Sequence, residues 1–94
     1  MTQRFGIETE EFKNLVADLR RRIEQIPLDE TQRVEANADL STIGAQIQSP
    51  DPKHSVIRAC MVSLQNILND MPLEPSTAAT LALVSFWLHT NPPI

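Results

Sequence analysis

Apolar residues recur along the first part of this chain at alternating steps of three and four, the spacing that gathers them on one face of a helix. Thr9 is placed to cap this helix, with Glu10 and Glu11 in the first turn, where the helix dipole favours acids. Pro27 disfavours helical geometry at the residue before it and ends the segment, which we predict near 9–26. The stripe consists of Phe12, Leu15, Val16, Leu19, Ile23 and Ile26.

A second helix is predicted near 29–49. Asp29 is placed to cap it, and Gln32 stands three residues later, as a capping box requires. The apolar stripe is thinner here, and we expect Gly44 at the closest approach to a neighbouring helix, because a residue without a side chain permits close backbone contact. The stripe residues are Ala36, Leu40, Ile43 and Ile47, with Val34 beside them.

The third helix is predicted near 52–71, with Asp51 as its cap and Pro52 in the first helical position. It carries a wider apolar face than the first helix does. Pro72 follows the segment and ends it. The face consists of Val56, Ile57, Cys60, Met61, Leu64, Ile67, Leu68 and Met71.

The fourth segment, near 75–90, contains the stretch around which the chain is organised. Residues 77–88 (TAATLALVSFWL) carry no charge and include the only tryptophan, Trp87. Their apolar residues do not keep to one face, a pattern typical of a helix that is buried on most sides. We expect Glu74 or Ser76 to open this helix, and the first three helices to cover it.

Four helices joined by connections of two to four residues favour an all-α fold in which consecutive helices are antiparallel neighbours. We therefore predict a single domain over residues 1–94, built as a small up-down-up-down four-helix bundle, with residues 1–8 as a flexible lead-in. Seven prolines, most of them between the periodic segments, and only two glycines agree with helices joined by short turns.

The two halves of the chain differ in how many charged residues they contain. Of the formal net charge of −4, residues 1–40 contribute −3, from nine acids and six bases. Beyond residue 53 only Arg58, Asp70 and Glu74 are charged. The second half therefore has too little polar surface to face water alone, and packing within the chain, a second copy or another protein must cover it.

Composition also excludes several classes of protein. A mildly acidic chain lacks the basic surface that nucleic acids and anionic membranes require. One cysteine, Cys60, excludes an internal disulfide. The N-terminus has no signal-peptide pattern, and the C-terminal apolar run is too short for a membrane anchor, so the expected compartment is the cytoplasm.

Few residues suggest catalytic or metal chemistry. His54, in the first turn of the third helix, is expected on the surface, and His89 is expected to cap the end of the fourth. Cys60 lies on an apolar face, as a buried cysteine does. No ligand spacing for a metal and no phosphate-binding loop is present, so we expect no metal, no cofactor, no small-molecule substrate and no enzymatic activity.

The one basic cluster is Arg20-Arg21-Arg22, expected as a solvated face balanced by Asp18 and Glu24. This cluster and Arg33 could together contact nucleic acid, but the net negative charge of the chain argues against such a role.

The apolar excess of the third and fourth helices favours a non-enzymatic module that binds another protein or forms a homodimer. The predicted interface consists of Val56, Met61, Leu81, Val84, Phe86, Trp87 and Leu88. The alternative is a small acidic inhibitor or adaptor, of the phage or immunity type, that occludes a larger protein. Its contact residues would be Glu10, Glu11, Asp18, Glu30, Glu35 and Asp39.

Overall fold

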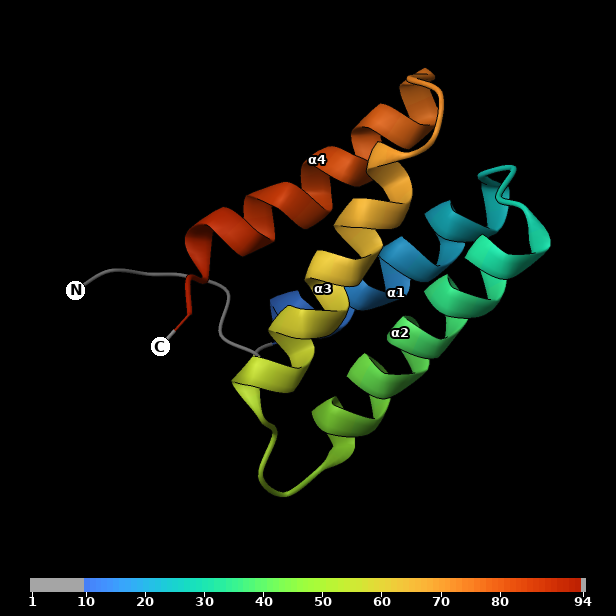
Figure 1. The fold of residues 1–94 in the computed structure, drawn as a ribbon. Coiled ribbons are helices and arrows are strands. Elements are labelled where there is room, and N and C mark those ends of the chain that lie inside the picture. The colour runs from blue at the N-terminus through green and yellow to red at the C-terminus, as the bar shows by residue number, and fades with distance from the viewer. Residues whose placement is uncertain (1–9, 94) are drawn as a thin grey trace.

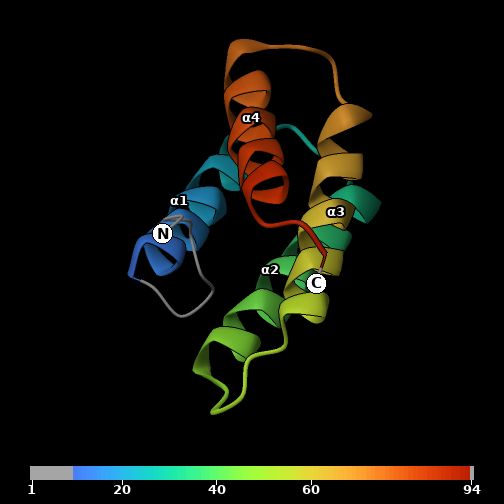
Figure 2. The same ribbon diagram turned by 90° about the vertical axis from the view of Figure 1, so that its left-hand side faces the viewer.

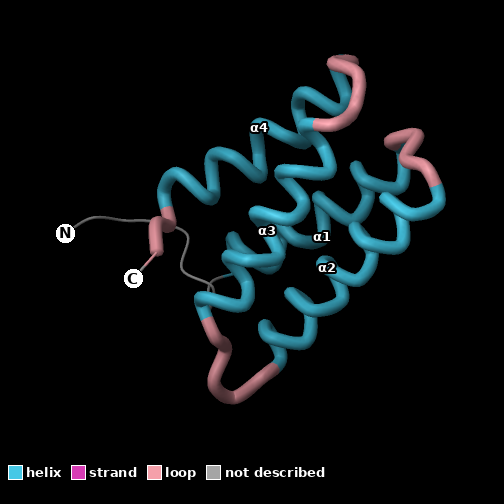
Figure 3. The backbone as a smooth tube through the Cα atoms, in the orientation of Figure 1, coloured by secondary structure: helices cyan, strands magenta, loops and turns pink. Residues whose placement is uncertain are grey.

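The computed structural model describes residues 10–93, and four helices account for most of them. They are α1 (Glu10–Gln25), α2 (Glu30–Gln48), α3 (His54–Asn69) and α4 (Pro75–Thr90). Short loops join them, and the described residues contain no strand (Figure 3). The predicted all-α, four-helix fold is confirmed. The predicted cap Thr9 and the lead-in 1–8 lie outside the described residues.

Consecutive helices run in opposite directions and form a closed ring of neighbours. α1 packs against α2, α2 against α3, α3 against α4, and α4 returns to α1 (Figure 1). Within residues 10–93 the diagonal pairs, α1 with α3 and α2 with α4, make no comparable contact. A view from the side shows α4 bridging α1 and α3 (Figure 2). Each helix therefore has two helical neighbours and an outward side.

The core forms between these helices from the faces that the periodicity predicts. Phe12, Val16, Leu19 and Ile23 of α1 are buried. So are Ala36, Leu40 and Ile43 of α2, whereas Ile47 is only partly buried and Val34 is 64% exposed. α3 contributes the largest set, in agreement with its wide apolar face: Ile57, Cys60, Met61, Leu64, Ile67 and Leu68.

The junction between α1 and α2 is held by side chains. The Asp29 carboxylate accepts from the Gln32 amide at 2.7 Å, and the Gln32 side chain accepts from the Asp29 amide at 3.1 Å. The predicted capping box is therefore confirmed. The Arg33 guanidinium donates to the carbonyls of Ile23 and Ile26 at the end of α1, each of which also accepts from a backbone amide in the turn. Arg33 thus has a structural role at this turn.

The predicted start of α3 is wrong by two residues. The N-cap is Lys53, whose side chain makes no capping hydrogen bond. The Asp51 amide donates to Ser49 Oγ at 3.1 Å, and the Lys53 amide donates to Gln46 Oε1 at 2.8 Å. These bonds hold the Asp51–Lys53 stretch against the end of α2, so that the helical ladder starts only after Lys53.

The two aspartates predicted as caps therefore provide a matched pair of variants. Asp29→Ala removes a side-chain acceptor from the start of α2 and is expected to lower the free energy of unfolding by about 1 kcal/mol. Asp51→Ala removes no cap and is expected to change it by less than about 0.5 kcal/mol. Urea unfolding followed by circular dichroism measures both, and equal effects would contradict the assignment of Lys53 as the N-cap.

Gly44 makes room for a side chain and not for the backbone of a neighbouring helix. A methyl group at Gly44 would lie 3.2 Å from Nη2 of Arg20. The same nitrogen donates to the Leu40 carbonyl at 3.0 Å. The close contact predicted at Gly44 is thus a crossing of the Arg20 guanidinium from α1 over α2.

Candidate protein-interaction surface

α4 buries one face against the bundle. Trp87 is fully buried, with its ring centroid 5.4 Å from that of Phe12 and 5.9 Å from that of His54. The rest of the buried face combines apolar residues with two threonines: Thr77, Thr80, Val84 and Leu88. The Thr80 hydroxyl donates to the Ser76 carbonyl at 2.8 Å, which lets this polar residue sit in an apolar environment.

Four of the seven predicted interface residues belong to this core. Met61, Val84 and Trp87 have no accessible surface, and Leu88 keeps only 7% of its own. They have almost no area to offer a second molecule. Val56 and Leu81 are partly buried, and Phe86 is the one member of the set that is largely exposed, at 62%.

The outward side of α4 carries a continuous apolar stripe. Pro75, Ala79, Ala82 and Phe86 follow one another at steps of four, three and four, which places them on one face of the helix, and all four are exposed. Leu83 lies beside them and is partly buried. We call these four residues the outer face of α4. The expectation that α4 is covered on most sides is wrong, because among the described helices only α1 and α3 pack against it.

A polar residue stands at each end of this outer face. Glu74, the N-cap residue, and His89, in the last turn, are both exposed. The cap predicted for His89 is made by its neighbours instead. Thr90 Oγ1 donates to the carbonyl of Phe86 at 3.0 Å, and Asn91 Nδ2 donates to that of Trp87 at the same distance. Within residues 10–93 the side chains of Glu74 and His89 form no hydrogen bond or ion pair.

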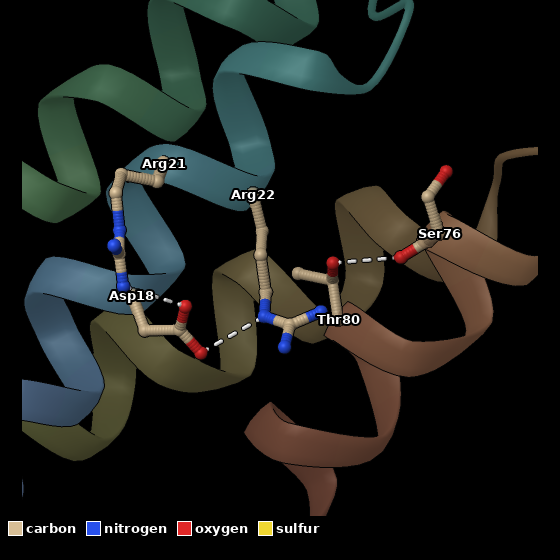
Figure 4. A network of polar contacts seen from close by, with 5 residues as sticks. All are labelled: Asp18, Arg21, Arg22, Ser76 and Thr80. Atoms are coloured by element: carbon tan, nitrogen blue, oxygen red, sulfur yellow. Dashed lines mark hydrogen bonds and ion pairs between the residues drawn. The ribbon is translucent and has the colours of Figure 1, made fainter.

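The basic cluster on α1 is occupied by contacts within the chain. Asp18 accepts from Arg22 Nε at 2.9 Å and from Arg21 Nη2 at 3.1 Å. Figure 4 shows both arginines on Asp18, with the Arg22 guanidinium pointing from α1 toward Thr80 of α4. Asp18 therefore offsets part of the charge of this cluster, while the Arg21 side chain stays 76% exposed and Arg20 donates to the Leu40 carbonyl.

The acids proposed for an inhibitor surface do not form one free patch. Asp18 is paired as described, and Glu10 lies 3.6 Å from the ammonium of Lys13. Asp39 is partly buried, and its Oδ2 is inaccessible and has no hydrogen-bond partner in the described part of the chain. Glu11, Glu30 and Glu35 remain exposed, divided between α1 and α2.

Cys60 and Asp39 lie where α2 packs against α3. The folded protein favours the uncharged form of both side chains. Burial raises the pKa of the Cys60 thiol, and the negative charge of Asp39 raises it further. A thiol with a raised pKa is a poor nucleophile at neutral pH, which agrees with a packing role for Cys60. Burial likewise raises the pKa of Asp39, partly opposed by a hydrogen bond with the Ser63 side chain.

The raised pKa of Asp39 predicts a destabilising charge at neutral pH. Because the folded chain holds this proton more tightly than the unfolded chain, stability is lost as pH rises from the unfolded value of about 3.9 through the folded value. Asp39→Asn is therefore expected to raise the urea midpoint at pH 7, with the gain disappearing below about pH 3.9.

Asp18→Asn is the matched control, and we expect it to change stability in the opposite direction. The hydrogen bond from Arg22 is the main cause that lowers the pKa of Asp18. The ionised Asp18 therefore stabilises the fold above its unfolded pKa, and this contribution is lost as pH falls through the folded value. Asp18→Asn should lower the urea midpoint at pH 7. A lower midpoint for Asp39→Asn as well would show that Asp39 is not destabilising.

His54 does not have the surface position predicted for it. Its ring lies partly buried against Trp87, and its Nε2 is inaccessible and without a hydrogen-bond partner in the described part of the chain. An open pocket of about 560 Å³ lies next to it. Arg58, in the wall of this pocket, donates from Nε to the Asn91 carbonyl at 3.2 Å and so fastens the C-terminal tail to α3. The other lining residues are Lys53, Ser55, Ala59 and Pro93.

Comparisons with protein-family models, with curated proteins and with solved structures return no match for this chain. Among the described residues, no group of three or more histidine, cysteine or acidic side chains is placed to hold a metal ion. No helix within that part of the chain has both the length and the apolar character needed to cross a membrane.

Proposed function

We propose that this chain is a non-enzymatic protein–protein interaction module that associates with a second copy of itself through the outer face of α4. The observation that carries the proposal is the position of Phe86, 62% exposed on a helix face without charge. Burial of a phenylalanine side chain stabilises a contact by about 1.5–3 kcal/mol relative to leaving it exposed. Aromatic residues of this kind often dominate the energetics of interfaces.

A second copy fits this face because the face is complementary to itself. A two-fold interface presents the same patch from both subunits, so each patch must contain both the projecting group and the space that receives it. Phe86 projects from the outer face, whereas Ala79 and Ala82, on the same stripe, are small. Since residues 77–88 carry no charge, the chain's net charge of −4 adds no direct repulsion at the centre of the contact.

Phe86→Glu tests this proposal, because it places a charge on the outer face without touching the core. Sedimentation velocity of the full chain at increasing concentration should show a monomer–dimer equilibrium for the native protein and a monomer for Phe86→Glu. Circular dichroism should show the same helical content for both. The contact between two single helices is small, so we expect a reversible dimer.

Val34→Glu is the matched control. Val34 is exposed to a similar extent, 64%, but lies on α2, which does not pack against α4. It should sediment like the native chain. A native protein that remains monomeric at several hundred micromolar, or equal effects of the two variants, would refute the proposal. Added salt distinguishes it from a contact made by acids, since only a charge-driven contact weakens as ions screen it.

A further inference from the structure

The residues at the two ends of the outer face point to a specific arrangement of the dimer. We infer that the second copy binds with its α4 antiparallel to the first, so that Phe86 of each chain packs over Ala79 of the other and His89 of each lies beside Glu74 of the other. This arrangement rests on the proposed function and specifies the orientation and register of the same contact.

The spacing along α4 supports a two-fold axis close to Ala82. In an antiparallel pair, residues at equal distances on either side of the axis face each other. Phe86 is four residues after Ala82, and Ala79 is three residues before it. His89 is seven residues after Ala82, and Glu74 is eight before it. Each pair therefore matches to within one residue, an axial offset of about 1.5 Å in a helix.

Lateral placement agrees with this register. A rotation of 100° per residue places His89 and Glu74 on the same side of the outer face. A two-fold axis perpendicular to both helices brings this side of one chain next to the same side of the other chain. Both side chains are exposed, and neither forms a hydrogen bond or ion pair within residues 10–93. The imidazole of His89 can donate to the Glu74 carboxylate, and the dipoles of two antiparallel helices also attract each other.

A parallel pair lacks these advantages. Each Phe86 would meet the other Phe86, and Glu74 of one chain would lie about 22 Å along the helix axes from His89 of the other. The two small residues would also face each other and leave a space between the helices. The antiparallel arrangement fills this space with Phe86 and pairs each carboxylate with a histidine.

Cysteine cross-linking under mild oxidation tests the orientation. A disulfide forms only between Cα atoms closer than about 7 Å. In the antiparallel pair, Ala82→Cys places two thiols near the axis and should cross-link, whereas His89→Cys places its Cα atoms about 20 Å apart and should not. The native chain is the control, because its one cysteine, Cys60, is buried.

When the native chain is dimeric, the cross-linking pattern decides the orientation, and cross-linking of His89→Cys alone would overturn the inference. Cross-linking of Ala82→Cys alone supports the antiparallel pair. Cross-linking of both variants shows a parallel pair and overturns the inference, while leaving the proposed function intact. Cross-linking of neither shows that the chains meet elsewhere and also overturns the inference. A native chain that does not dimerise refutes the proposed function itself.

Charge exchange tests the register. Glu74→Lys and His89→Glu should each weaken dimerisation by about three- to tenfold, since two symmetric contacts are lost. The double variant should recover most of this affinity, because the introduced lysine and glutamate can pair with each other at the same contact. Single variants without effect, or a double variant no better than the singles, would overturn the pairing of His89 with Glu74. Thermal melts of each variant confirm that it is folded.

Discussion

Replacing Trp87 with alanine is expected to lower the free energy of unfolding by about 3–5 kcal/mol, the range for truncating a large aromatic residue in a core. Trp87 has no accessible surface and contacts rings from two other helices, Phe12 of α1 and His54 of α3. Its loss therefore leaves a space shared by three helices, which small shifts of the backbone do not fill. Domains of this size are stable by only about 5–15 kcal/mol, so the variant approaches the limit of folding.

Phe86→Ala is the control for this prediction, since it truncates the neighbouring aromatic residue on the same helix. Phe86 is 62% exposed, and its truncation should change stability by less than about 0.5 kcal/mol in the monomer. Thermal unfolding followed by circular dichroism measures both variants, because Trp87→Ala removes the only tryptophan fluorophore. Each kcal/mol corresponds to about 4–8 °C in Tm for a domain of this length. Similar Tm values for the two variants would contradict the burial of Trp87.

Replacing Ile43 with alanine is expected to lower the free energy of unfolding by about 2–5 kcal/mol. Ile43 is fully buried on the side of α2 that faces the core. Val34 lies on the same helix and is also β-branched, but it is 64% exposed. Val34→Ala should leave stability unchanged or raise it slightly, because alanine has the higher helix propensity.

Chemical denaturation at a concentration low enough to keep the protein monomeric measures this pair. The expected result is a large fall in the urea midpoint for Ile43→Ala and no fall for Val34→Ala, with the same slope for both. A fall of similar size for both variants would mean that Val34 also packs against other residues. A dimer would complicate the comparison, because association stabilises the folded form by mass action.

These predictions concern the two helices for which periodicity was least informative. α1 has a one-faced stripe, so its buried residues follow directly from steps of three and four. α2 contains few large apolar residues, and Val34 and Ile43 are chemically alike although only one of them is buried. Only the spacing distinguishes them, because Ile43 falls in the stripe with Ala36 and Leu40 whereas Val34 falls beside it.

For α4, periodicity predicts the buried face even less well than for α2. Its buried face includes Thr77 and Thr80, whereas its exposed face includes Phe86. Hydropathy alone would place the two threonines on the exposed face and Phe86 on the buried face. The residues missing from the predicted interface, Ala79 and Ala82, carry no distinctive signal of their own. They become recognisable only as members of the stripe that contains Phe86 and faces away from α1 and α3.

The two predicted caps show, in single hydrogen bonds, the difference between a contact contained in the local sequence and one made by a more distant residue. Asp29 caps α2 through contacts within four residues, which the local sequence contains. Asp51 stands before a proline in an equally favourable local pattern, but α3 begins after Lys53. The difference arises because Gln46 on α2, seven residues earlier, accepts from the Lys53 amide.

The sequence alone determined the class of this protein: four helices, their approximate limits, the buried stripe of α1 and the broad apolar face of α3. These features depend on helical periodicity, on prolines and on contacts between near neighbours, all of which are local. Only the tertiary structure decided which side of α4 is covered, where Arg20 binds, and that Trp87 is internal while Phe86 is external. Those outcomes depend on which helices lie next to one another, and packing between residues far apart in the chain sets that arrangement.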